Sequence, residues 1–258
     1  MSDIGVLTTT FYKSMEELRF HLACQLVGNA IAVGHGVMVV DGSPDAAIGR
    51  SFLWLGAAVL PQTASGLGRS RRELFRHALD QGSHRGLLPQ IFLWTEEKVD
   101  LVRWIPRIAA PIERGEADIV IPARTDQSWA SYPAFQIESE KAANAVYAEV
   151  TGNAFDAMFG PVAYSRRMGS YFAECNPKER YGAADNYIQH VAPLEAMADG
   201  ARVVSVPVDF FYPSAQKAEE EAALSEAMRE KRRRQFEDCT QTYRLVAAAL
   251  GLPKRKNS

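Results

Sequence analysis

The chain has 258 residues, of which 47% are hydrophobic and 23% are charged. This composition is ordinary for a globular protein and excludes a chain that is disordered along its length. The 29 lysine and arginine residues nearly balance the 31 aspartate and glutamate residues, which gives a net charge of −2. Such a charge argues against a protein whose main task is to coat nucleic acid or an anionic membrane.

The cysteines and the apolar stretches narrow the class further. Cys24, Cys175 and Cys239 are widely spaced and form no CxxC pair, which argues against a disulfide scaffold or a structural zinc site. No apolar stretch reaches the roughly 20 residues that a membrane span needs. The first residues also lack the basic and apolar regions of a signal peptide. We therefore expect a cytoplasmic protein without a transmembrane segment.

Short apolar runs alternate with longer amphipathic stretches in the first half of the chain. The pattern predicts strands at residues 4–10, 36–41, 57–61, 88–95 and 117–122. It predicts helices at residues 14–33, 45–55, 70–81 and 102–114, the first of them with Ser14 as its N-cap. Short strands that alternate with helices of this length indicate βαβ units and a mostly parallel sheet. Because such sheets bind ligands at the carboxyl ends of their strands, we look for chemistry there.

The second half of the chain is less regular and ends in a long polar stretch. Its pattern predicts helices at residues 138–150 and 184–198 and strands at residues 162–165 and 202–212. Residues 214–250 contain neither glycine nor proline, which predicts one long C-terminal helix. Its apolar residues step by three and four and form one stripe: Phe236, Cys239, Tyr243, Val246 and Leu250. We expect this stripe to pack on the body of the protein or on a second copy in a homodimer.

Polar motifs follow three of the predicted strands, in an order that resembles a known family. VVDGSPD (residues 39–45) follows the second strand, SGLGRSRRELFRHAL (65–79) the third, and an acidic pair the fourth. This order is similar to the nucleotide-sugar-binding half of family 2 glycosyltransferases, which carry V-V-D-D-G-S-x-D, then N-x-G-x-x-x-A-R-N, then a DxD pair. FGPVAYSRR (159–167) resembles the family's Gly-Gly-x-x-x-x-Arg-Arg strand, and residues 181–192 stand in place of its acidic helix.

The resemblance implies a fold and a reaction. The fold is an α/β, GT-A-like single domain over residues 1–213, with a mostly parallel central sheet flanked by helices. Residues 214–258 then form a C-terminal helical extension. The reaction is transfer of a sugar from a nucleoside-diphosphate sugar, such as a UDP-sugar, to the hydroxyl of a small or soluble acceptor. Two alternatives stay open, a nucleotidyltransferase of related fold and a non-catalytic nucleotide-sugar-binding protein.

The resemblance also assigns residues to the nucleotide. Asp41 would hydrogen-bond the nucleobase or ribose, and Thr9 and Thr10 would line the base pocket. Gly66 and Gly68 would let the backbone approach the ligand closely, because glycine has no Cβ.

The chain departs from the family at the DxD pair. Thr95-Glu96-Glu97-Lys98 stands where the family's carboxylates hold Mg²⁺ or Mn²⁺ against the diphosphate. The resemblance therefore makes Glu96 the metal ligand, with Glu97 as its alternative, and places Glu97 and Lys98 at the donor. Arg71 stands where the family's Ala-Arg-Asn arginine sits, near the nucleotide. In the other reading, Lys98 and the arginines supply the positive charge without a metal ion.

Asp185 is the candidate general base. An inverting transferase needs a carboxylate to take the proton of the acceptor hydroxyl. The family places an aspartate at the start of a helix after an aromatic-glycine segment, which matches Tyr181-Gly182-Ala183-Ala184-Asp185. Ala184 replaces the family's preceding acid. The sequence therefore predicts an inverting reaction with Asp185 at the start of a helix.

Overall fold

In the computed structural model, which describes residues 3–80, 90–223 and 226–253, seven strands form one sheet in the order β3-β2-β1-β4-β6-β5-β7. The strands are β1 (Ile4–Thr10), β2 (Gly36–Asp41), β3 (Ala58–Pro61), β4 (Ile91–Trp94), β5 (Ile119–Arg124), β6 (Val162–Ser165) and β7 (Val203–Val208). Strand β6 pairs antiparallel with β4 and β5, whereas the other neighbours pair in parallel. The predicted mostly parallel sheet is confirmed.

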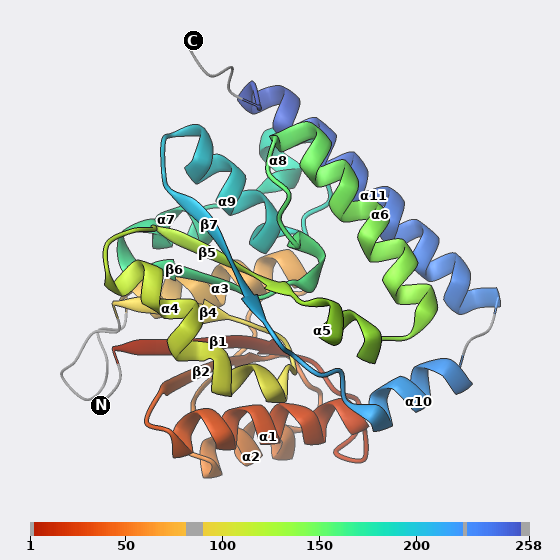
Figure 1. The fold of residues 1–258 in the computed structure, drawn as a ribbon. Coiled ribbons are helices and arrows are strands. Elements are labelled where there is room, and N and C mark those ends of the chain that lie inside the picture. The colour runs from red at the N-terminus through yellow and green to blue at the C-terminus, as the bar shows by residue number, and fades with distance from the viewer. Residues whose placement is uncertain (1–2, 81–89, 224–225, 254–258) are drawn as a thin grey trace.

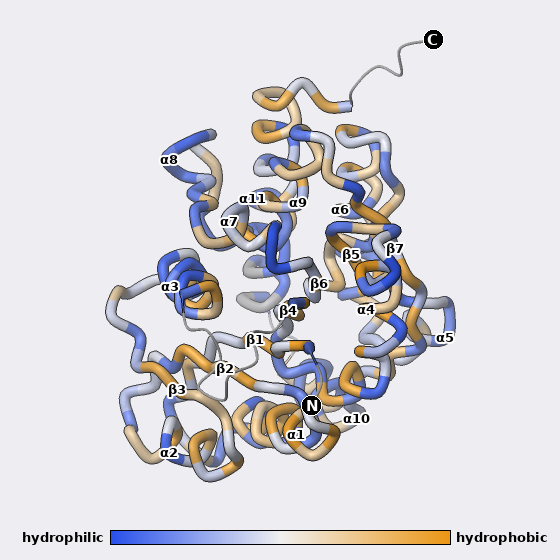
Figure 2. The backbone as a smooth tube through the Cα atoms, turned by 90° about the vertical axis from the view of Figure 1, so that its left-hand side faces the viewer, coloured by the Kyte–Doolittle hydropathy of each residue, from blue (hydrophilic) through white to orange (hydrophobic). Residues whose placement is uncertain are grey.

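Helices cover both faces of this sheet, as Figures 1 and 2 show. One face carries α1 (Leu18–Ala32), α2 (Ala46–Trp54), the 3-10 helix η1 (Val99–Trp104) and α4 (Ile105–Glu113). The other face carries α3 (Leu67–Asp80), α7 (Gly169–Ala173), α9 (Ile188–Ala198) and, packed against each other, α6 (Ala134–Thr151) and α11 (Glu226–Leu250). The remaining helices are α5 (Asp126–Ser131), η2 (Ala157–Phe159), η3 (Arg166–Met168), α8 (Pro177–Tyr181) and α10 (Ser214–Ala222).

The sheet separates two hydrophobic cores. Val39 belongs to the core under α1, α2 and α4, and the next residue, Val40, belongs to the core under α3, α7 and α9. Successive side chains of a strand point to opposite faces, so a strand that is buried on both faces reads as a continuous apolar run. This is why the apolar runs of the sequence locate these strands correctly.

The first helix begins later than predicted. Ser14 is not its N-cap, because α1 starts at Leu18 with Glu17 in the capping position. The Glu17 carboxylate accepts hydrogen bonds from the backbone N–H groups of Lys13 (2.5 Å) and Ser14 (3.1 Å). Those bonds stabilise a turn before the helix, and the Ser14 hydroxyl accepts from the N–H of Glu16 within that turn.

The predicted single helix over residues 214–250 is wrong, because α10 ends at Ala222 and α11 starts at Glu226. The guanidinium of Arg232 lies 3.6 Å from the carboxylate of Glu220. On a straight helix, the backbones of residues 12 positions apart would be about 18 Å apart along the axis, too far for these two side chains to meet. The chain therefore bends between the two helices. The apolar stripe is confirmed for its central members, since Cys239, Tyr243 and Val246 are fully buried in the core that α11 shares with α9 of the same chain.

Among the described residues, no helix has both the length and the apolar character that crossing a membrane requires.

Candidate functional site

A cavity of about 990 Å³ opens beyond the carboxyl end of β4. Its walls come from the segment after β4, the start of α3, α9, α6, the segment after β7, and helices α10 and α11. The volume lies at the upper end of the range for small-molecule sites. Open α/β sheets bind their ligands at this edge. The position and size make this cavity the candidate functional site.

The two carboxylates of the acidic pair after β4 differ in accessibility, because one is held by hydrogen bonds and the other is more exposed. Glu97 accepts hydrogen bonds from the Tyr12 hydroxyl (2.5 Å) and from Arg19 (2.8 Å), and its side chain is only 13% exposed. Glu96 contacts Arg71 at 3.1 Å, and its side chain is 44% exposed. Burial alone would raise the pKa of Glu96, but Arg71, Lys98 and Arg19 outweigh it and lower that pKa. Glu96 is therefore an ionised carboxylate that is open to the cavity.

Arg71 is fixed at the cavity wall by contacts on several sides. Its guanidinium donates to the backbone carbonyl of Asn186 and to the side chain of Gln189 (2.7 Å), and it lies 4.5 Å from the centroid of the Trp94 ring. Burial lowers the pKa of Arg71, although Glu96 partly offsets the effect. The contacts orient one edge of the guanidinium toward Glu96.

The side-chain ammonium of Lys98 lies against two aromatic rings. Its ammonium lies 5.3 Å from the ring centroid of Phe159 and 5.8 Å from that of Phe210. Within residues 3–80, 90–223 and 226–253, no side chain or backbone group forms a hydrogen bond or an ion pair with this ammonium. Burial lowers the pKa of Lys98, and Glu96 opposes that effect. An ammonium in such a position suits an anionic ligand.

His190 lines the cavity as a neutral imidazole. Its Nδ1 lies 2.6 Å from the hydroxyl of Tyr243, which comes from α11. Burial, together with repulsion by Arg71, lowers the pKa of His190 to about 3. The ring is therefore uncharged at neutral pH.

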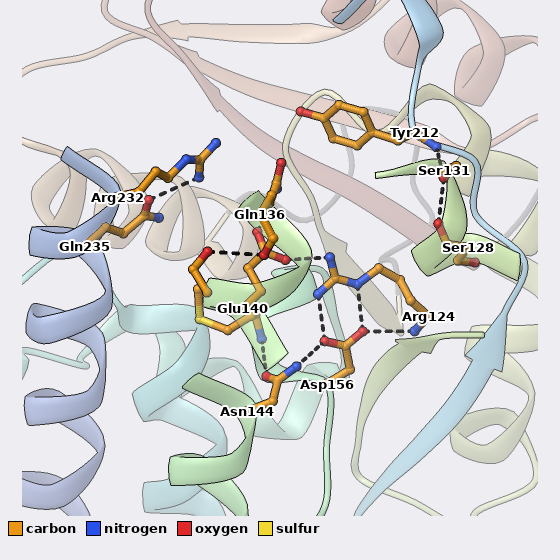
Figure 3. Close-up of polar contacts among 12 residues, drawn as sticks. Arg124, Ser128, Ser131, Gln136, Glu140, Asn144, Asp156, Tyr212, Arg232 and Gln235 are labelled. Carbon is orange, nitrogen blue, oxygen red and sulfur yellow. Dashed lines mark hydrogen bonds and ion pairs between the residues drawn. The ribbon is translucent and has the colours of Figure 1, made fainter. Parts of the chain in front are cut away.

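A buried polar network supports the α6 side of the cavity (Figure 3). The Arg124 guanidinium donates to both oxygens of Asp156 (2.8 Å each) and to Glu140 (2.5 Å). Arg124 also lies 3.6 Å from the ring centroid of Trp129. Glu140 in turn accepts a hydrogen bond from the side-chain amide of Gln136 (2.6 Å). Glu140 and Gln136 both line the cavity, so the network holds two polar side chains rigidly at its wall.

The residues assigned to the nucleobase come together beside the cavity but do not line it. Thr10 and Asp41 are register partners in β1 and β2, and the Thr10 hydroxyl donates to Asp41 at 2.8 Å. Ser43 also donates to Asp41 (2.6 Å) and accepts from the backbone N–H of Tyr12 (2.9 Å). Thr9 is half-buried on the same strand end. Since the Tyr12 hydroxyl reaches Glu97, a continuous chain of contacts joins this cluster to the cavity.

Asp185 lies in a different setting from the predicted one. It precedes α9 in a turn, because the helix starts only at Ile188. Both carboxylate oxygens accept hydrogen bonds from Arg72, at 2.6 and 2.9 Å. Its neighbour Asn186 lines the cavity, whereas Asp185 is not among the lining residues. The carboxylate is thus engaged by the Arg72 guanidinium, and the Asp185 side chain is 28% exposed.

The two glycines before and in α3 serve the protein's own backbone. Gly66 has a φ of +106°, which side-chain-bearing residues rarely adopt. A Cβ on Gly68 would lie 2.2 Å from the carbonyl oxygen of Asp185. The close approach that was predicted at Gly68 therefore exists, but in this structure the neighbour is Asp185.

Metal-binding groups are sparse in the part of the chain that the structure describes. Within it, no three His, Cys, Asp or Glu side chains are placed to hold a metal ion together. Glu96 is the more exposed carboxylate of the predicted pair, and both oxygens of Glu97 already accept hydrogen bonds.

The sequence predicted four cavity residues and missed others. Four residues that the sequence assigned to the donor or the metal ion line the cavity: Arg71, Glu96, Glu97 and Lys98. The sequence did not indicate Arg19, Gln136, Glu140, His190 and Tyr212. None of them was assigned a role by the resemblance, although His190 lies within residues 181–192. Only the tertiary packing of α1, α6, α9 and the segment after β7 brings their side chains to the same space.

No family model and no curated protein matches this chain. Among solved structures it is similar to glucosyl-3-phosphoglycerate synthase from Mycobacterium tuberculosis in complex with Mn²⁺, UDP-glucose and phosphoglyceric acid, with 14% identity and a TM-score of 0.57 over 98% of this chain and 81% of that chain. A structure described as a mycobacterial protein matches with 13% identity and a TM-score of 0.60 over 97% of this chain and 75% of that chain. The GT-A-like α/β fold is thus confirmed.

Proposed function

We propose that this chain is a glycosyltransferase that moves a sugar from a nucleoside-diphosphate sugar to an acceptor hydroxyl. The observation that supports it most is the cavity beyond β4, where Lys98, which has no counter-ion among the described residues, lies two positions after the partly exposed Glu96. The fold supports the proposal, because the similar synthase from M. tuberculosis was solved with UDP-glucose and Mn²⁺.

The donor would extend from the cavity toward the ends of β1 and β2. Lys98 and Arg71 would face the diphosphate, since an ammonium and a guanidinium stabilise phosphate oxygens. Thr9, Thr10 and Asp41 would then contact the nucleobase or ribose. Tyr12 supports this path, because it contacts Ser43 with its backbone and Glu97 with its hydroxyl. Gly66 and Gly68 would contribute indirectly, by allowing the backbone conformation and the close packing at the start of α3.

Glu96 fits a divalent cation that is shared with the donor. Mg²⁺ is commonly held by one or two carboxylates together with substrate phosphates. One open carboxylate, ionised in its surroundings, meets that requirement with the diphosphate. Bound there, Mg²⁺ or Mn²⁺ would supply charge stabilisation for the leaving diphosphate. In the alternative without a metal ion, Lys98 and Arg71 stabilise that charge themselves.

Inverting transfer with Asp185 as the general base remains a prediction. A base must reach the acceptor hydroxyl directly or through one water molecule. The two hydrogen bonds from Arg72 stabilise the charged carboxylate and occupy both of its oxygens. These contacts favour a positioning role, in which Asp185 holds the turn that presents Asn186 to the cavity.

Donor binding tests the proposal directly. We expect UDP and UDP-glucose to bind in isothermal titration calorimetry, and Lys98→Met to weaken both by roughly tenfold or more, the usual worth of a charged hydrogen bond. Lys178→Met is the matched control, because Lys178 is exposed on α8. Failure of UDP, GDP and ADP to bind at millimolar concentration would overturn the proposal. Binding without sugar transfer would favour a non-catalytic binder, and pyrophosphate release from a nucleoside triphosphate would favour a nucleotidyltransferase.

A further inference from the structure

We infer that the α6 and α10 side of the cavity binds the acceptor by accepting hydrogen bonds from it, and that the acceptor is an uncharged polyhydroxy compound, such as a sugar or polyol. The inference rests on the proposed glycosyl transfer and specifies the acceptor. Two side chains carry it, Gln136 of α6 and Glu220 of α10.

Gln136 presents an amide oxygen without a partner. The residue is only 8% exposed, and its amide nitrogen donates to Glu140 at 2.6 Å, which fixes the orientation of the amide. Its Oε1 is buried and accepts no hydrogen bond from the described residues, although the residue lines the cavity. Buried polar atoms are nearly always hydrogen-bonded. A ligand that donates a hydrogen bond would satisfy this oxygen.

Glu220 presents a second oxygen that lacks a hydrogen bond among the described residues. Its Oε1 accepts from the Tyr212 hydroxyl (2.7 Å) and from Gln216 (3.3 Å). Its Oε2 is buried and accepts no hydrogen bond from the described residues, and its one partner among them is the guanidinium of Arg232, with which it forms an ion pair at 3.6 Å. Both oxygens that lack a hydrogen bond on this side of the cavity, Gln136 Oε1 and Glu220 Oε2, are therefore acceptors, and a ligand hydroxyl would donate to either of them.

The charges on this side also disfavour an anionic acceptor. Among the described residues, those of α6, α10 and α11 that line it carry four carboxylates against two guanidinium groups: Glu140, Glu220, Glu230 and Asp238 against Arg232 and Arg234. Both guanidinium groups are already ion-paired, Arg232 with Glu220 and Arg234 with Glu230. Behind Glu140, the opposite charges of Arg124 and Asp156 cancel. A phosphate or carboxylate group would meet repulsion here and would bring no hydrogen to Gln136 or Glu220. A sugar hydroxyl brings one without a charge.

This acceptor differs from the one in the similar synthase, whose structure holds phosphoglyceric acid. Matched pairs of compounds test the difference on the full chain, with glucose against glucose 6-phosphate and glycerol against glycerol 3-phosphate. Binding is measured by calorimetry without donor, and transfer by acceptor-dependent release of UDP from UDP-glucose. We expect the uncharged member of at least one pair to bind, and to exceed its phosphate partner in kcat/KM by about tenfold or more.

Two variants test whether the preference for an uncharged acceptor depends on Gln136 and Glu220. Gln136→Leu should raise the KM of the uncharged acceptor by about tenfold, with a smaller change in kcat, because it removes a binding contact. Gln25→Leu, an exposed position on α1, is the matched control. Glu220→Gln removes a charge from α10, a helix without buried residues, so it should fold normally and narrow the gap between each compound and its phosphate partner.

The outcomes separate this inference from the proposed function. Equal or better binding of the phosphate members, or no binding of either uncharged member at millimolar concentration, would overturn the inference. An unchanged KM in Gln136→Leu would overturn the role of that residue. If UDP-glucose itself does not bind to the unmodified chain, the proposed function fails, whereas transfer to phosphate acceptors alone would leave that function standing and remove only the inference.

Discussion

Gly68 and Asp185 lie in direct backbone contact, although 117 positions separate them in the sequence. A Cβ at residue 68 would lie 2.2 Å from the carbonyl oxygen of Asp185 and 2.3 Å from its carboxylate Oδ2. The same carboxylate accepts two hydrogen bonds from Arg72, one turn further along α3. The start of α3 and the turn before α9 therefore form one unit. This unit holds Asn186 and Arg71 at the cavity wall.

Gly68→Ala tests that contact. The added methyl group would overlap backbone as well as side-chain atoms of Asp185, and we expect a loss of about 1–3 kcal/mol in the free energy of unfolding. Chemical denaturation measures the loss. Gly36→Ala is the control, because a Cβ there meets nothing within 4 Å. Equal stability of the two variants would contradict the close packing of α3 on this turn.

Asp185→Asn separates a positioning role from a catalytic one. The structure favours positioning, so we expect a loss of about 1–3 kcal/mol in stability, because Arg72 is buried and loses its ionic partner. Turnover should fall by less than about tenfold. Thermal denaturation and steady-state kinetics measure the two effects, with exposed Asp126→Asn as control. A fall in kcat of about 10²–10⁴ at unchanged stability would instead identify Asp185 as the general base.

Glu96→Gln tests the divalent cation. The substitution keeps the shape of the side chain but removes the charge that a metal ion needs. We expect Mn²⁺ to enhance UDP binding in the unmodified chain and to do so roughly tenfold less in the variant. Calorimetry with and without Mn²⁺ gives both values, and Glu113→Gln, exposed at the end of α4, is the control. An unchanged response to Mn²⁺ would remove Glu96 as the ligand and favour charge stabilisation by Lys98 and Arg71.

The sequence predicted the parts of the fold that local chemistry determines. Val39 and Val40 lie in a continuous apolar run, and that run is a strand buried on both faces. The acidic and basic residues after β4 were predicted because they follow a strand directly. The bend between α10 and α11 was not predictable in this way, since the Tyr212–Glu220 and Arg232–Glu220 contacts depend on tertiary structure.

Dependence on tertiary structure also explains why only part of the candidate site was predicted from the sequence. Gln136 lies in a helix whose sequence carries no catalytic or binding motif. His190 lies within residues 181–192, where the resemblance assigned a role to Asp185 alone. Both become cavity residues only through packing. Asp185 shows the converse. Its local pattern matches a family motif, but the partner that decides its environment, Arg72, lies 113 residues earlier in the chain. No spacing rule in the sequence relates these two positions.

The lowered pKa of His190 predicts how the free energy of unfolding changes with pH. Its pKa in the folded chain is lowered to about 3, against 6.5 for an ordinary histidine, because burial and Arg71 disfavour the charged ring. Between these two pH values the unfolded chain binds a proton that the folded chain does not. The contribution of His190 to the free energy of unfolding therefore rises with pH from about 3 to 6.5 and is constant above that range.

The variant His190→Gln should remove this dependence while retaining a polar partner for the Tyr243 hydroxyl. We expect the unmodified chain to lose up to about 1.4 kcal/mol more per pH unit than the variant as the pH falls below 6.5, the most that one proton can contribute. Urea denaturation at a series of pH values measures the difference. His21→Gln, exposed on α1, should follow the unmodified chain. If His190→Gln also follows it, His190 takes up its proton without unfolding, and the neutral imidazole assigned to the cavity wall is incorrect.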